Sequence, residues 1–139
     1  KNFEIKNFKK RFEKREYFPR LMTKKNAFIN WNWSARDILL FCNSFDAPYP
    51  GAMTFHGKNL VFFKGVKLHN SNRYHPFAAG LVLKKNKEKL YVITVKGTLE
   101  IRNCLFNNRS INKKIKQGDR FYTPSKNLDE AAIFKPKYK

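Results

Sequence analysis

The segment from residue 28 to residue 52 constrains the fold most, because it holds a capped helix and a turn that stops it. Ser34 can cap this helix, since its hydroxyl can accept a hydrogen bond from a free N–H of the first turn. Asp37 falls within that turn, where a negative charge suits the helix N-terminus. Apolar residues then recur on one helical face: Ile38, Leu39, Phe41, Cys42 and Phe45. The sequence therefore predicts a helix from Ser34 to Phe45.

The run that follows this helix is Pro48-Tyr49-Pro50-Gly51. Proline cannot continue a helix, and glycine accepts backbone angles that other residues avoid, so we expect a rigid turn here. Upstream, residues 27–33 read as an extended segment that places Trp31 and Trp33 on one face. We expect at least one of these two side chains to fill the core beside the helix.

Beyond Gly51 the pattern changes to short β runs separated by turns. Strands are predicted at residues 52–56, 60–68, 79–83, 90–95, 98–105 and 120–124. Residues 69–75 read as a loop, 84–89 as a charged hairpin connection, 117–119 as a turn and 128–134 as one or two helical turns. Gly65 interrupts the second strand and indicates a β-bulge. Several short strands after one helix suggest a small barrel.

Three strings in this pattern resemble a known family: Ile29-Asn30-Trp31, Ser34-Ala35-Arg36-Asp37-Ile38 and Pro48-Tyr49-Pro50-Gly51-Ala52. They are similar to the C-terminal domain of the 10-formyltetrahydrofolate-dependent formyltransferases, which include methionyl-tRNA formyltransferase and the sugar N-formyltransferases. The resemblance implies a mainly β fold with one N-terminal helix and a small OB-like, partly open antiparallel barrel. It also implies three parts: a basic linker from a missing catalytic domain (1–27), the barrel domain (28–124) and a C-terminal tail (125–139).

The formal net charge of +20 on 139 residues favours an anionic partner such as nucleic acid, an acidic membrane surface or an acidic protein. An AT-rich genome would also encode a chain this rich in Lys, Asn, Phe and Ile, so a biased composition is an alternative explanation of the charge. The candidates for nucleic-acid contact are the basic residues Lys58, Lys64, Lys67, Arg73, Lys84, Lys85, Lys87, Lys113, Lys114 and Lys116.

Catalytic groups are not evident in this chain, for which we expect no catalytic, cofactor-binding or metal-binding residue. The family resemblance assigns 10-formyltetrahydrofolate and an Asn-His-Asp group to the catalytic domain, and nothing here matches that group. His56 reads as a hairpin-turn residue and His75 as a loop or capping residue, with no positioned acid–base pair. Asp119 should order the Gly118 turn or pair with Arg120. No CxxC spacing and no apolar run of transmembrane length occurs.

Cys42 and Cys104 are isolated cysteines and read as buried free thiols, which indicates a reducing, cytoplasmic compartment. The sequence has no initiating Met, so we interpret it as part of a longer or processed chain.

Three functional hypotheses follow, and the first is favoured. The chain is the non-catalytic C-terminal domain of a methionyl-tRNA formyltransferase-like protein, which positions tRNA for an N-terminal formyltransferase domain. Alternatively, it belongs to a sugar N-formyltransferase acting on a nucleotide-linked amino sugar, or it is a stand-alone module that binds structured RNA or the ribosome. Residues 104–109 depart from the tRNA enzymes, and residues 118–124 look more like the sugar type, whereas the charge favours RNA.

Overall fold

The computed structural model describes residues 26–46 and 50–133. Helix α3 (Ala35–Ser44) precedes the strands, and helix α4 (Ser125–Ile133) follows them. The strands are β1 (Ala52–His56), β2 (Asn59–Arg73), β3 (Val82–Asn86), β4 (Lys89–Ile93), β5 (Lys96–Phe106), β6 (Arg109–Ser110) and β7 (Phe121–Tyr122). Two single-turn 3-10 helices are η1 (Pro76–Ala78) and η2 (Asn112–Lys114). Three predicted segments lie partly outside these ranges: residues 1–25 of the linker, residues 48 and 49 of the turn after the helix, and residues 134–139 of the tail.

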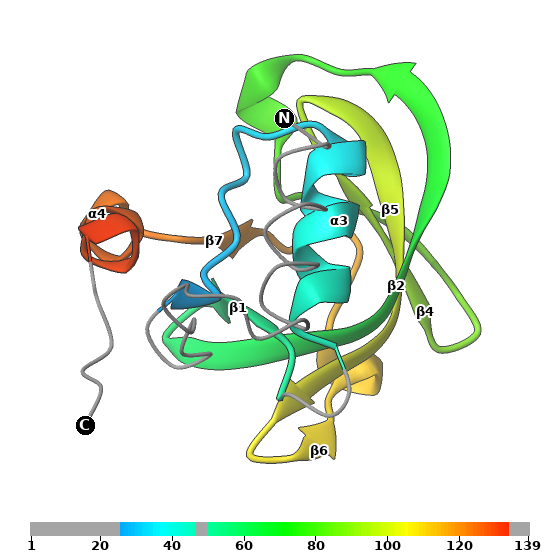
Figure 1. Cartoon of the computed structure of the whole chain (residues 1–139). Coiled ribbons are helices and arrows are strands. Elements are labelled where there is room, and N and C mark those ends of the chain that lie inside the picture. Colours follow the sequence, from blue (N-terminus) through cyan, green and yellow to red (C-terminus); the bar gives the residue numbers. More distant parts are fainter. Residues whose placement is uncertain (1–25, 47–49, 134–139) are drawn as a thin grey trace.

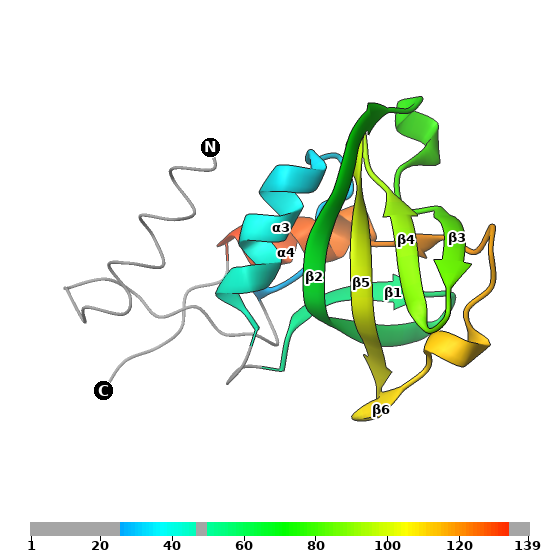
Figure 2. The same cartoon turned by 90° about the vertical axis from the view of Figure 1, so that its right-hand side faces the viewer.

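The strands form one antiparallel, seven-stranded sheet in the order β3-β4-β5-β2-β1-β7, and β6 pairs with the end of β5. The sheet curls into a half-barrel, and α3 lies in its open side (Figure 1). The view at 90° shows β2, β5 and β4 side by side, with α3 next to β2 (Figure 2). The predicted mainly β, OB-like, partly open barrel with a helix before its strands is confirmed, and α4 adds a second helix.

Gly65 lies in β2 two residues after the pairing with β1 ends at Phe63, while the pairing with β5, which begins at Phe62, continues. Phe63 and Val66 both face the core although they are three residues apart, which a regular strand of period two does not allow. Gly65 has a φ of +69°, and a Cβ on it would lie 2.9 Å from the Cβ of Arg102. The pairing with β5 continues in register through this point, so the predicted bulge at Gly65 is wrong. The register shifts come later, between Leu68 and Arg73.

Helix α3 confirms the predicted cap and limits. The backbone N–H of Asp37 donates to Ser34 Oγ at 3.2 Å, and the N–H of Phe45 donates to the Cys42 carbonyl at 3.1 Å. Ile38, Cys42 and Phe45 are buried, whereas the other two residues of the predicted apolar face are only partly buried. Because α3 packs against β2 and β5, it closes the concave side of the sheet.

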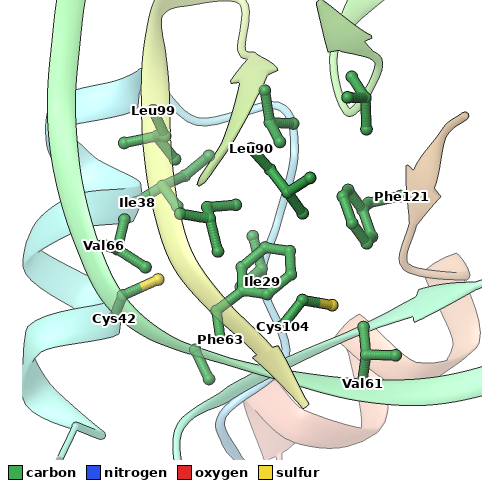
Figure 3. Packing of buried hydrophobic residues seen from close by; sticks show 14 of the residues in the cluster. Ile29, Ile38, Cys42, Val61, Phe63, Val66, Leu90, Leu99, Cys104 and Phe121 are labelled. Carbon is green, nitrogen blue, oxygen red and sulfur yellow. The ribbon is translucent and has the colours of Figure 1, made fainter. Parts of the chain in front are cut away.

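The core brings together side chains from α3, β2, β4, β5 and β7 (Figure 3). Its centre is aromatic: the ring centroid of Phe121 lies 4.9 Å from that of Phe63 and 6.2 Å from that of Trp31. Trp31 Nε1 donates to Thr54 Oγ1 at 2.9 Å, so its polar atom is satisfied in the core. The prediction that one tryptophan fills the core is confirmed. Trp33 lies beyond a turn at Asn30, so the two rings do not share an extended face.

Several predicted boundaries are wrong. β2 continues to Arg73, so most of the predicted loop at 69–75 is strand. The predicted connection at 84–89 is mostly the paired ends of β3 and β4, which leaves a two-residue turn at Lys87 and Glu88. The strand predicted at 79–83 begins only at Val82. Short strand β6 was not predicted, and the helix predicted at 128–134 begins at Ser125.

Among the helices within residues 26–46 and 50–133, none combines the length and the apolar character that crossing a bilayer requires.

Candidate nucleic-acid interface

A row of cross-strand neighbours crosses four strands on the face of the sheet that points away from the core. Lys84 of β3 pairs with Tyr91 of β4, Tyr91 pairs with Glu100 of β5, and Glu100 pairs with Lys67 of β2. Directly paired residues place their side chains on the same face, so the two lysines lie at the ends of one line. Lys89 adds a third cation, with its Nζ 3.8 Å from Glu100 Oε2. We call Lys67, Lys84 and Lys89 the basic row.

Tyr91 lies in the middle of this row and contacts Lys84 and His69. Lys84 Nζ lies 5.1 Å from the centroid of its ring, a cation–π distance, and the ring of His69 lies 4.4 Å away. Only 6% of Tyr91 is exposed. The ring is therefore covered and does not offer a free stacking surface, and Lys84 Nζ lies over it.

A second group of cations lies at the corner formed by the β5–β6 hairpin and η2. Arg109, Lys113 and Lys114 are all exposed there. Lys113 Nζ lies 3.6 Å from Oε1 of Glu88, which belongs to the β3–β4 turn. We call Arg109, Lys113 and Lys114 the basic corner. Two of its members were predicted candidates, and the structure adds Arg109 beside them.

Asn112 fixes this corner to the sheet. Its side-chain oxygen accepts from the backbone N–H of Cys104 at 2.8 Å. Its amide nitrogen donates to the carbonyl of Arg102 at 2.8 Å and also to the carbonyl of Glu88. The residue is 1% exposed, so these bonds satisfy a polar group that would otherwise be costly to bury. Sequence reasoning missed Asn112, because the backbone groups that it binds lie 8 to 24 residues away in sequence.

A hydrogen bond between His56 and Asp119 lies close to two further candidates, Lys58 and Lys116. His56 Nε2 lies 2.9 Å from Asp119 Oδ2, which also accepts from the backbone N–H of Lys116 at 3.0 Å. The backbone hydrogen bond from Lys116, followed by the hydrogen bond and charge of His56, lowers the pKa of Asp119 from its ordinary value. The contact draws the β1–β2 turn that carries Lys58 toward the loop that carries Lys116.

This pair corrects two expectations. The expectation that no acid–base pair is positioned is wrong, since His56 and Asp119 form one. The expectation that His56 lies in the hairpin turn is also wrong, since His56 is the last residue of strand β1. Asp119 does order the turn, as predicted, but it pairs with His56 and not with Arg120, whose guanidinium donates to the Ala79 carbonyl at 2.9 Å. The carboxylate of this pair also holds the loop through the backbone N–H of Lys116.

His75 caps η1, which confirms the capping role that the sequence predicted as one of two alternatives. Its Nδ1 accepts from the backbone N–H of Phe77 at 3.1 Å. The residue is otherwise exposed. It therefore has a local structural explanation.

The other four candidates lie apart from these groups. Arg73 is at the far end of β2, opposite Lys96, and Lys64 pairs with Asn103 next to the bend. Lys87 occupies the β3–β4 turn with a φ of +60°. Lys85 pairs with the buried Leu90 and so lies on the core side of edge strand β3, where an inward charge discourages edge-to-edge association. The ten candidates therefore do not share one face.

The curled sheet with a helix in its open side places the chain among small, partly open β-barrel domains. A family model described as "Formyl transferase, C-terminal domain" matches residues 21–117. The match covers more than half of the chain, and the chain belongs to this family. A search of curated proteins found no match.

Proposed function

We propose that this chain is the acceptor-binding domain of a formyltransferase, that its acceptor is tRNA, and that it holds tRNA through phosphate contacts. A separate N-terminal domain would bind 10-formyltetrahydrofolate and transfer the formyl group. The observation that carries the proposal is the net charge of +20 together with the grouping of cations in the basic row and the basic corner. Lysine and arginine on such a surface would contact phosphates without reading base sequence.

The distribution of acidic partners supports this proposal. Within residues 26–46 and 50–133 there are three ion pairs, and they involve His56, Lys89 and Lys113 as the basic partners. Lys67, Lys84, Arg109 and Lys114 take part in none of these pairs. Cations outside such pairs keep their charge available for phosphate, and their binding would release counterions from RNA.

The alternative acceptor is a nucleotide-linked amino sugar. It is favoured by residues 104–109, which depart from the tRNA enzymes, and by the resemblance of residues 118–124 to sugar-type formyltransferases. A nucleotide sugar needs only a local cationic site, whereas the basic row and the basic corner lie on different elements. We also propose that the protein works in the cytoplasm, because Cys42 and Cys104 are buried free thiols.

A salt titration of tRNA binding tests the proposal. We expect affinity to fall steeply as salt rises, and the triple variant Lys113→Gln/Lys114→Gln/Lys116→Gln to lower the slope by about one unit for each phosphate that the variant no longer binds. The double variant Lys96→Gln/Lys126→Gln removes exposed charge outside the candidate set and should change the slope less per charge. A basic protein of equal net charge is the second control. If its curve superimposes on that of this chain, the tRNA proposal fails.

A further inference from the structure

A surface hollow of about 440 Å³ lies between the β5–β6 hairpin and η2. It is lined by Phe106, Asn107, Arg109, Ser110, Ile111 and Lys114. Its size is within the range of pockets that hold small ligands. Among these lining residues the charged groups are two cations and no carboxylate.

Phe106 forms the aromatic side of this hollow. Its side chain is partly buried and packs against the main core, so it is held by the fold while part of it stays accessible. Phe106 pairs directly with Arg109 across the hairpin, which puts both side chains on one face. The two-residue turn between them has positive φ at Asn107 (53°) and Asn108 (64°), as a tight hairpin turn with primed geometry requires.

Lys114, which lines the hollow from η2, supplies the second cation. It belongs to η2, which Asn112 ties to the carbonyl of Arg102 and the N–H of Cys104 on β5. Lys113, its neighbour, is engaged with Glu88 at 3.6 Å, whereas Arg109 and Lys114 are in none of the ion pairs found in the described parts of the chain. The hollow thus combines one accessible aromatic ring with two cations outside those pairs.

We propose that this hollow binds a nucleoside phosphate, with the base against Phe106 and the phosphate between Arg109 and Lys114. Bases stack on aromatic side chains whatever their identity, and the planar guanidinium of Arg109 can contact a phosphate with two parallel hydrogen bonds. The inference deepens one part of the proposed function and rests on it, namely that this domain binds the acceptor of a formyltransferase, which would supply the nucleotide. That source is either an unpaired nucleotide of the acceptor RNA or the nucleotide of a nucleotide-linked sugar, since both present the same chemistry.

The experiment follows the backbone amide signals of residues 107–110 and 114 by NMR in the full chain. The probes are UMP, inorganic phosphate, single-stranded hexauridylate, UDP-N-acetylglucosamine and a short RNA duplex. We expect UMP to shift these signals and to bind more tightly than inorganic phosphate. Phe106→Leu keeps an apolar side chain for the core but removes the ring, and it should weaken UMP binding at least about fivefold. Arg109→Gln and Lys114→Gln should weaken it as well, and Lys126→Gln in α4 is the matched control.

The ligand that binds more tightly identifies the source of the nucleotide. If hexauridylate binds more tightly than UDP-N-acetylglucosamine and the difference depends on Phe106, the source is RNA. If the order is reversed, the source is a nucleotide sugar. Either order supports the site. Equal binding of UMP and inorganic phosphate, or UMP binding unchanged by Phe106→Leu in a variant with an unchanged melting temperature, overturns it. The duplex has no unpaired base, so the salt dependence of its binding tests the proposed function separately from the hollow.

Discussion

His56 Nε2 and Asp119 Oδ2 lie 2.9 Å apart and join the end of β1 to the loop that precedes β7. The same carboxylate oxygen accepts from the backbone N–H of Lys116 at 3.0 Å. The His56 ring also lies against Phe121, with 5.7 Å between ring centroids. One acidic group therefore closes the loop and fixes it against the edge of the barrel.

The first prediction concerns acid stability. The pKa of Asp119 is lower in the folded protein than its ordinary value of 3.8, first through the Lys116 hydrogen bond and then through His56. Its contribution to stability is therefore fully present above the unfolded pKa and is lost as pH falls through the folded one. We expect Asp119→Asn to cost about 1 kcal/mol at neutral pH and progressively less below pH 3.8.

Urea unfolding followed across that pH range measures the effect. Asp129→Asn, an exposed carboxylate of α4, serves as the control. A difference between wild type and Asp119→Asn that stays constant as the pH falls below 3.8 would contradict the assignment.

The second prediction concerns Asn112. Replacing it by Ala leaves the N–H of Cys104 and the carbonyls of Arg102 and Glu88 without their partner beneath η2. An unsatisfied buried polar group costs roughly 1–3 kcal/mol, so we expect a loss of about 3 kcal/mol or more in the free energy of unfolding. Denaturant unfolding measures it, and Gln117→Ala removes an exposed amide nearby as control. Equal effects of the two substitutions would show that Asn112 does not hold the corner.

The third prediction compares two glycines with similar backbone angles. Gly65 has φ +69° and Gly57 has φ +63°, so alanine is strained at both. At Gly65 the added Cβ would also lie 2.9 Å from Arg102 Cβ, whereas at Gly57 nothing lies within 4 Å. We expect Gly57→Ala to cost about 1 kcal/mol and Gly65→Ala roughly 1–3 kcal/mol more, since the bend of β2 depends on it. Thermal unfolding of both variants measures this, and equal losses of stability would refute the close approach.

The fourth prediction concerns the thiols. Burial raises the pKa of Cys104 to about 12 and also raises the pKa of Cys42, where Asp46 adds to the effect. Because the thiolate is the reactive form, we expect both residues to react very slowly with an alkylating reagent at about pH 8 in the native protein. Mass spectrometry of the labelled protein with and without denaturant measures this. Rapid modification of the native chain would mean that one thiol is accessible.

Local signals in the sequence were sufficient to predict helix α3. Its cap at Ser34 and its apolar spacing both act within a few residues, so tertiary contacts did not move its limits. The strand pattern after Gly51 was also sufficient for the fold class. The length of β2 was not predictable in this way, because His69 to Arg73 is polar and becomes strand only by pairing with β5.

The candidate interface depended much more on the tertiary structure. The sequence identified which residues are basic, but it could not show that Lys67 and Lys84 lie at the two ends of one row, since three strand registers decide that. It also could not show that Phe106 and Lys114 line one hollow, because Asn112 positions η2 through partners on β5 and at the β3–β4 turn.

The sequence by itself determined the helix, the number of cations and the mainly β character, since capping, charge and alternation are properties of neighbouring residues. Only the tertiary structure decided which of these cations lie together and what holds them there. The reason is that register, strand bending and buried hydrogen bonds join residues far apart in the chain, as His56 and Asp119 do across 63 positions.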